Sequence, residues 1–244
     1  FLRPEGVNEG LDQLRTFDID ALVVIGGDGS FRGAWELDQR GFPVAGVPGT
    51  IDNDVAGTDA TIGFDTAANT ALEAVVRLRD TASSHDRLFI VEVMGRGSGY
   101  LALYVGVSGG AELVVVPEVP FDLERTCERL HYGRKRGKTH SLIVLAEGVM
   151  PAHELAAKLQ DTGGYDARIT VIGHIQRGGG PTAADAVLAS RMGAHAVEAL
   201  LAGERGIMVG SVDNAMVTSP LPTAWESKKA LPQALLRLVD TLSI

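Results

Sequence analysis

The sequence predicts an α/β protein with mostly parallel sheets, and three observations carry this prediction. Short runs of β-branched residues alternate with helical patterns along the 244 residues, which is typical of consecutive βαβ units. The chain contains 30 glycines, which supply the positive φ angles that tight strand-to-helix turns need. Polar, glycine-rich loops follow most of the strand-like runs, at the sheet edge where parallel sheets place functional groups.

Strands are expected where short, β-branched apolar runs end at glycine, proline or polar loops. These runs occupy 21–25, 43–47, 88–93, 113–116, 141–146, 169–172 and 207–209. Helices are expected where apolar residues recur with a period near 3.6 residues. These patterns occupy 31–39, 66–80, 100–107, 122–134, 153–160, 182–201 and 228–242, and the first residues form a loop that enters a further helix.

Three features add detail to these helices. The pattern at 100–107 is apolar on most faces, which predicts a buried helix. Asp122 is the expected N-cap of the helix that follows it. Cys127 occupies an amphipathic pattern, which predicts a half-buried packing residue, and as the single cysteine it excludes an internal disulfide.

The overall composition narrows the possible partners and the compartment. The formal net charge is −9, which disfavours a general nucleic-acid binder, because such a protein needs a basic surface. No signal peptide is recognisable and no apolar run is long enough to span a membrane. The cysteine usage fits the cytoplasm. We therefore expect a cytoplasmic protein that binds neither nucleic acid nor membrane.

The first unusual loop is GGDGS, directly after the first expected strand. Gly26, Gly27 and Gly29 allow the backbone to approach a ligand, and Ser30 is placed to cap the following helix, whose N-terminus attracts anions. Asp28 puts a carboxylate inside this anion site, which favours Mg²⁺ bound also by nucleotide phosphates. A simple glycine turn with Asp28 as helix cap is the alternative, so this motif alone does not decide.

The second unusual loop, PGTIDNDVAGTD, carries several carboxylates. Thr50, Asp52 and Asp54 alternate, so in an extended loop their side chains can share one face. Phosphoryl transfer to an alcohol requires a base for the hydroxyl proton and positive charge for the transferring group. One carboxylate could be the base while the others act through metal or water. Alternatively, Asn and Asp form this turn for purely local reasons.

Five loops together resemble the phosphofructokinase family in order and spacing. They are GGDGS, PGTIDNDVAGTDATIGFDTA, VEVMGRGSGYLAL, AEG and GHIQRGGGPTA, and they extend over nearly the whole chain. The resemblance implies a glycolytic kinase that transfers the γ-phosphate of MgATP to the 1-hydroxyl of fructose 6-phosphate, giving fructose 1,6-bisphosphate and ADP. It also implies two similar three-layer α/β domains with the active site in the cleft between them.

The resemblance also implies a domain organisation. The ATP-binding domain is expected to combine residues 1–63 with 176–226, and the fructose 6-phosphate domain to combine 64–175 with 227–244. The family's first strands, a further glycine-rich loop and an arginine that touches the transferred phosphate would precede Phe1. This stretch alone is therefore expected to be poorly soluble and nearly inactive. A homotetramer is the family expectation.

Four catalytic residues and a nucleotide loop follow from the resemblance. Asp52 corresponds to the general base that removes the sugar hydroxyl proton, and Arg96 to the arginine that stabilises the transition state. Thr50 and Asp54 correspond to residues beside the transferring phosphate. The ATP phosphates are expected to contact a loop whose aspartate also holds Mg²⁺: Gly27, Asp28, Gly29 and Ser30.

The sugar phosphate is expected to contact a larger set of residues. Arg87 and Arg168 correspond to residues that reach into a neighbouring subunit's site, and Glu147 to a carboxylate that accepts sugar hydroxyls. The full set is Thr50, Ile51, Asp52, Arg87, Met94, Gly95, Arg96, Glu147, Arg168, His174, Ile175, Gln176 and Arg177. Each also has an ordinary interpretation; His174 taken alone would be a buried histidine bonded to the backbone.

Two glycines bear on the phosphoryl donor. Pyrophosphate-dependent members that resemble this chain usually read GGDDS and PKTIDND, whereas Gly29 and Gly49 stand at those positions here. An aspartate at the first position would fill space used by the α-phosphate, and a lysine at the second would add charge for a small donor. The sequence therefore favours ATP, with a pyrophosphate-dependent enzyme or a non-catalytic regulatory subunit as alternatives.

A regulatory site is also implied, since bacterial members bind ADP or phosphoenolpyruvate between subunits. The basic run RKRGK suits a polyphosphate in an acidic protein, although basic residues also favour the C-terminal end of any helix. The expected effector residues are Arg79, Gly110, Ala111, Glu112, Arg136, Lys138, Thr139 and His140. Thr139 departs from the lysine that related sequences often carry, which leaves the strength of the effector open.

Overall fold

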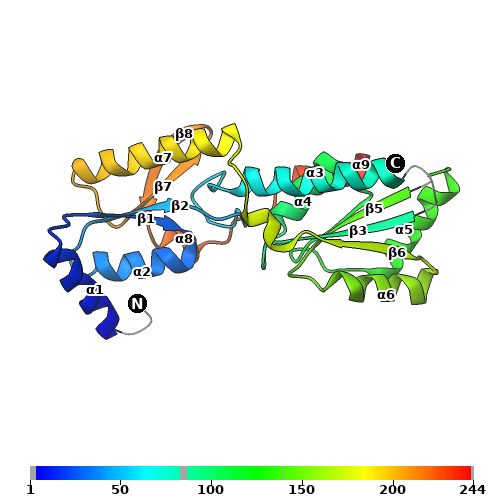
Figure 1. The fold of residues 1–244 in the computed structure, drawn as a ribbon, viewed down its shortest axis with the longest axis horizontal. Coiled ribbons are helices and arrows are strands. Elements are labelled where there is room, and N and C mark those ends of the chain that lie inside the picture. The colour runs from blue at the N-terminus through cyan, green and yellow to red at the C-terminus, as the bar shows by residue number, and fades with distance from the viewer. Residues whose placement is uncertain (1–3, 83–86, 139, 243–244) are drawn as a thin grey trace. The chain divides into compact units, whose positions relative to one another are not determined.

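The protein is described here by a computed structural model that covers residues 4–82, 87–138 and 140–242. The predicted α/β class is confirmed: helices cover the faces of two four-stranded sheets, and the strand pairs are parallel except for one hairpin (Figure 1). None of the described helices combines the length and apolarity needed to cross a lipid bilayer.

The chain divides into two compact units, each built from two segments. The first unit combines Phe1–Gly63 with Pro181–Lys229, and the second combines Phe64–Gly180 with Ala230–Ile244. The crossing after Gly63 coincides with an expected domain boundary. The other two crossings follow Gly180 and Lys229, a few residues later than the sequence places them.

The first unit is a three-layer sandwich around the sheet β1-β2-β7-β8. Its strands are β1 (Leu22–Gly26), β2 (Val44–Pro48), β7 (Ile207–Val212) and β8 (Ala215–Pro220), and its helices are α1 (Pro4–Thr16), α2 (Asp28–Asp38), α7 (Ala183–Leu201) and α8 (Thr223–Glu226). Phe31 and Leu37 of α2 pack with Met208 on one face of the sheet. Met192 of α7 packs with Val209 on the other. Burial of these apolar side chains stabilises both faces.

The second unit has a fully parallel sheet in the order β4-β5-β3-β6. Its strands are β3 (Arg87–Val93), β4 (Leu113–Val115), β5 (His140–Ala146) and β6 (Ala167–Val171). Its helices are α3 (Phe64–Ala82), α4 (Tyr100–Gly109), α5 (Leu123–Lys135), α6 (Ala152–Gly163) and α9 (Gln233–Leu242), with a 3₁₀ turn, η1 (Gly173–Arg177). Helices α5 and α6 lie on one side of the sheet, and α3, α4 and α9 lie on the other (Figure 1).

Several local predictions are confirmed. Helix α4 is buried over most of its length. Asp122 caps α5 by accepting the Arg125 N–H at 3.0 Å. Cys127 is half-buried and packs against the core beneath α5 and α6.

Three elements were not predicted: strand β8, helix α8 and the 3₁₀ turn η1. Strand β8 pairs antiparallel with β7, through a two-residue turn in which Asp213 and Asn214 have φ angles of 49° and 63°. Such left-handed pairs are the usual tight connection between antiparallel strands. Helix α8 is a single turn of four residues, too short for a periodic pattern to reveal.

Candidate active site

The GGDGS loop joins β1 to α2 and leaves the start of that helix uncapped by a side chain. Gly27 occupies the N-cap position, and no side-chain capping bond is formed there. Asp28, Gly29 and Ser30 form the exposed first turn. The prediction that Ser30 caps the helix is wrong, because α2 begins at Asp28 and Ser30 lies within it. N–H groups at such a helix start attract anions, so the loop fits its expected contacts with ATP phosphates.

The carboxylate loop begins directly beside this anion site, because β1 and β2 are parallel neighbours. A Cβ placed on Gly27 would come within 3.9 Å of the Thr50 Cβ. The two alternating carboxylates differ in environment: Asp52 is buried, with 6% of its surface exposed, whereas Asp54 is exposed. The structure therefore brings the expected base and the expected nucleotide loop to one edge of one sheet.

The conformation of the carboxylate loop depends on Asn53. This residue has a φ of 51°, in the left-handed region that non-glycine residues seldom adopt. Its Oδ1 accepts the Thr61 N–H at 3.0 Å, and Thr61 Oγ1 donates to the Thr50 carbonyl at 2.6 Å. The Asp52 N–H donates to Thr50 Oγ1 at 3.2 Å. Hydrogen bonds across the loop thus hold the segment that carries the candidate base.

Lys229 also contacts this loop, although nothing in the sequence singles it out. Its Nζ donates to Asn53 Oδ1 at 2.9 Å and to the Asp59 carbonyl at 2.8 Å. Burial lowers the pKa of this ammonium group from 10.5 to about 8, and the carboxylates of Asp59 and Asp54 oppose the shift. The partners lie far away in sequence, so no local pattern could have revealed the contact.

The lowered pKa of Lys229 predicts a specific pH dependence of stability. Between about pH 8 and 10.5 the unfolded chain keeps this proton while the folded chain releases it, so stability rises with pH in that window. We expect the urea midpoint of the wild type to rise, relative to that of Lys229→Met, as pH is raised from about 7 to about 9.5. A constant difference between the two midpoints would contradict the burial of the charged lysine.

The MGR and AEG loops of the second unit contact each other at the carboxyl ends of β3 and β5. Gly95 has a φ of 143° and Arg96 a φ of 51°. The Gly95 and Arg96 N–H groups donate to Glu147 Oε1 at 3.2 and 2.9 Å. A Cβ added at Gly148 would lie 1.8 Å from the Arg96 carbonyl oxygen, so only glycine allows this approach. Glu147 therefore holds the backbone that presents the Arg96 side chain.

The GHIQR segment forms η1 after β6, the strand next to β3. Gln176 is buried at 1% exposure; its Oε1 accepts the Met94 N–H at 2.8 Å. His174, Ile175 and Arg177 are exposed. The ordinary interpretation of His174 as a buried histidine is therefore wrong. Gln176 thus connects η1 to the MGR loop, while its neighbours in η1 face solvent.

The remaining expected sugar-phosphate residues lie elsewhere in the second unit. Arg168 is near the amino end of β6, exposed and paired with Asp166 at 3.2 Å. Arg87 begins β3, and its side chain lies outside the described residues. Neither belongs to the carboxyl-end loops that hold Arg96 and His174, and their expected role in a neighbouring subunit's site stays a prediction.

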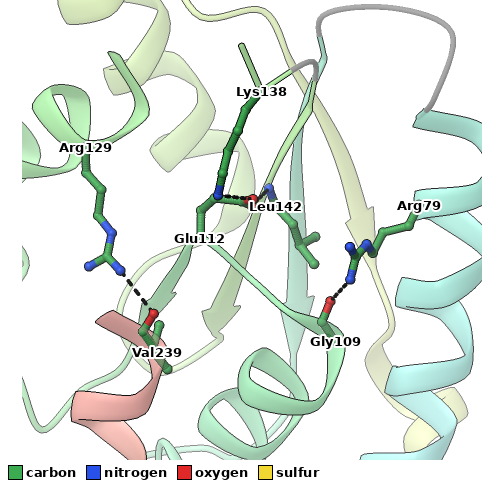
Figure 2. A network of polar contacts seen from close by, with 7 residues as sticks. All are labelled: Arg79, Gly109, Glu112, Arg129, Lys138, Leu142 and Val239. Atoms are coloured by element: carbon green, nitrogen blue, oxygen red, sulfur yellow. Dashed lines mark hydrogen bonds and ion pairs between the residues drawn. The ribbon is translucent and has the colours of Figure 1, made fainter. Parts of the chain in front are cut away.

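Three of the expected effector residues, Arg79, Glu112 and Lys138, appear in Figure 2, and Glu112 and Lys138 lie just before β4 and β5. Glu112 accepts Lys138 Nζ at 3.3 Å and the Leu142 N–H at 2.5 Å. Arg79 donates to the Gly109 carbonyl at 2.6 Å; Gly110, next along, is the left-handed C-cap of α4. Charged side chains of this group thus already make contacts within the protein.

Other members of the effector set lie on the flanks of that cluster. Arg136 ends α5 with its guanidinium 5.6 Å from the ring centre of Tyr132. His140 is the first residue of β5; Ala111 is buried. Thr139 lies outside the described residues. The cluster is at the strand ends opposite the MGR and AEG loops, so the second unit separates the two groups of expected ligand residues.

Asp28 is the expected magnesium ligand. Among the described residues, no group of three or more His, Cys, Asp or Glu side chains is arranged to hold a metal. Mg²⁺ bound with a nucleotide needs one or two carboxylates and takes its other ligands from phosphates and water. An exposed carboxylate in the first turn of an uncapped helix fits that requirement.

The first unit has an anion-attracting helix start and, on the neighbouring loop, a buried carboxylate, and phosphoryl transfer to an alcohol uses groups of both kinds. A site of this composition suits a phosphotransferase. A family model described as phosphofructokinase matches residues 1–200. This chain belongs to the phosphofructokinase family, and the resemblance seen in the five loops is confirmed.

Curated relatives agree with this assignment. An ATP-dependent 6-phosphofructokinase of Listeria welshimeri is 54% identical over 244 residues, which span 100% of this chain and 76% of the relative. An enzyme with the same name from Enterococcus faecalis is 51% identical over 232 residues, 95% of this chain and 72% of the relative. This chain thus spans about three quarters of their length.

Solved structures show the same fold. Phosphofructokinase of Pichia pastoris in the T-state aligns with a TM-score of 0.85 at 31% identity, over 99% of this chain and 30% of that chain. A pyrophosphate-dependent phosphofructokinase from Marinobacter aquaeolei aligns with a TM-score of 0.80 at 26% identity, over 98% of this chain and 71% of that chain.

Proposed function

We propose that this protein is an ATP-dependent 6-phosphofructokinase, which transfers the γ-phosphate of ATP to the 1-hydroxyl of fructose 6-phosphate. The observation that carries the proposal is Asp52, a buried carboxylate on the loop whose Thr50 lies next to Gly27, at the uncapped start of α2. The whole chain is also 54% identical to a relative named ATP-dependent 6-phosphofructokinase. A non-catalytic subunit would have no physical need for Asp28, Asp52 and Arg96 together.

Each residue has a role that its surroundings support. The first-turn N–H groups of α2 bind ATP phosphates, and Asp28 would hold Mg²⁺, which neutralises phosphate charge when bound. Asp52 accepts the proton of the sugar hydroxyl. The Arg96 guanidinium binds two oxygens of the transferring phosphoryl group. Thr50 and Asp54 lie on the same loop and line the path of that group.

The sugar phosphate is bound by the second unit and by a neighbouring subunit. His174 and Arg177 are exposed after β6 and bind the 6-phosphate together with Arg87 and Arg168 of an adjacent copy in a homotetramer. A carboxylate has about four acceptor positions, and the Gly95 and Arg96 N–H groups use two at Glu147. Glu147 can therefore also accept a sugar hydroxyl.

The first unit is the ATP-binding domain and the second the sugar-phosphate domain of a cytoplasmic enzyme. The cluster around Glu112 and Lys138 binds an ADP or phosphoenolpyruvate effector. A coupled assay on the full-length protein tests the main proposal: we expect turnover with ATP and fructose 6-phosphate and little with pyrophosphate or other sugar phosphates. Preferred turnover with pyrophosphate would overturn it in favour of the alternative donor.

Gly29 tests the choice of donor directly. A Cβ added there meets no atom within 4 Å, so Gly29→Asp should fold normally while placing a negative charge among the expected phosphate contacts. We expect kcat/KM for ATP to fall on the order of 10- to 100-fold. Gly29→Asn has the same shape without the charge and should lose less. Initial rates with ATP that are unchanged in the aspartate variant would contradict the donor assignment.

A further inference from the structure

The segment Asp52–Asp54 is held from a distant part of the chain by Lys229. Its Nζ donates to the Asn53 side chain at 2.9 Å and to the Asp59 carbonyl at 2.8 Å. Asn53 is 1% exposed and lies between the two expected catalytic carboxylates. The ammonium group therefore contacts the residue whose backbone sets the directions of both neighbours.

The backbone conformation of the loop depends on such support. Asparagine tolerates the left-handed φ of 51° seen at Asn53 better than most residues do, but it adopts this φ only where local contacts favour it. Thr61 supplies one contact through its N–H, at 3.0 Å from the same Oδ1. Lys229 supplies a second contact to that oxygen and also holds the far side of the loop at Asp59.

Lys229 also stands at a crossing between the units. The first unit ends at Lys229 and the second resumes at Ala230. The Ala230 carbonyl accepts the Tyr100 hydroxyl at 2.7 Å, so the two consecutive residues are anchored in different units. The carboxylate loop therefore forms its hydrogen bonds with the last residue of the first unit, directly before the chain enters the second unit.

We propose that Lys229 is a positioning residue for phosphoryl transfer, which holds Asp52 in the geometry that deprotonates the sugar hydroxyl. This inference rests on the proposed kinase function. The lysine does not act on substrate; it fixes the loop through Asn53 and Asp59. Its burial and its closeness to the carboxylates of Asp54 and Asp59 support an electrostatic role in addition, because a cation offsets repulsion among the acids of this loop.

The test replaces Lys229 with methionine in the full-length protein and uses Lys228→Met as the matched control. Lys228 is the exposed neighbour. A misplacement of about 1 Å at a reacting group can cost about 100-fold in rate, so we expect kcat of Lys229→Met to fall 10- to 100-fold. KM for ATP and for fructose 6-phosphate should change less than about threefold, because the phosphate contacts remain. Lys229→Arg, which keeps the charge and donors, should recover a large part of kcat.

Two further measurements keep the proposal falsifiable. Hydrogen exchange by mass spectrometry should show faster exchange in residues 50–61 of the methionine variant, with the α2 amides unaffected. If that variant does not fold, Lys229→Gln keeps N–H donors on a shorter, uncharged side chain and should show an intermediate loss of kcat. Values of kcat equal to the Lys228 control would overturn the inference, as would a rise in KM without a loss of kcat. Absence of turnover in the wild type would instead refute the proposed function.

Discussion

Replacing Asp52 with asparagine should lower kcat on the order of 1,000-fold, within the range that a positioned general base contributes. Asp52 is buried and begins the segment that Asn53 and its contacts hold in place. Asparagine has nearly the same shape, so the loop should keep its conformation while the group that takes the sugar proton is lost. The measurement is the initial rate at saturating ATP and fructose 6-phosphate.

A matched control separates this effect from a general loss of charge. Asp20 is an exposed carboxylate in the same unit, and Asp20→Asn should leave kcat within about twofold of the wild type, because isolated surface substitutions have small effects. KM values and the thermal midpoint of the Asp52 variant should remain close to those of the wild type. A kcat reduced less than about tenfold would remove Asp52 from the role of base.

The second large effect is expected at Arg96. The backbone that presents its side chain has φ values of 143° and 51° at Gly95 and Arg96, and the N–H groups of these two residues donate to Glu147. Lysine keeps the charge but cannot form the two-pronged contact with phosphoryl oxygens. We expect Arg96→Lys to lower kcat about 100- to 1,000-fold, in line with arginines that stabilise phosphoryl transfer.

Arg77 provides the comparison for this variant. It lies on α3, is exposed and pairs with Glu73 one turn away, so Arg77→Lys should have little effect on rate. The measurement compares kcat and KM for both substrates in the two variants. A kcat for Arg96→Lys within threefold of the Arg77→Lys value would show that Arg96 does not contact the transferring group.

The seven strands expected from the sequence are all present, for a physical reason. Parallel strands covered on both faces read as continuous apolar runs, and β2 and β5 are buried along nearly their whole length. Strand β8 has no fully buried residue and gives no such run. Its turn, Asp213–Asn214, did carry a local signal, since these residue types tolerate positive φ.

Details of the candidate site were harder to predict. The wrong capping assignment for Ser30 came from a helix boundary displaced by a few residues, and such boundaries are the least reliable part of a sequence pattern. The supporting role of Gln176 depends on two loops that meet only in the folded unit. Lys229 lies 176 positions from Asn53, and its neighbour Lys228 is identical in type but exposed. Only tertiary structure distinguishes the two lysines.

The interrupted course of the chain also bears on how the protein is made. In the first unit β2 pairs with β7, and the Gly63 N–H donates to Asp185 Oδ1 at 3.0 Å, so residues 64–180 leave and return at nearly the same place. On the ribosome that continuous stretch is translated before β7 and leaves the exit tunnel before β7 does. Most of the second unit can therefore begin to fold before β2 has paired with β7. At that stage β2 has an unpaired edge, and nascent strands with such edges are prone to aggregate.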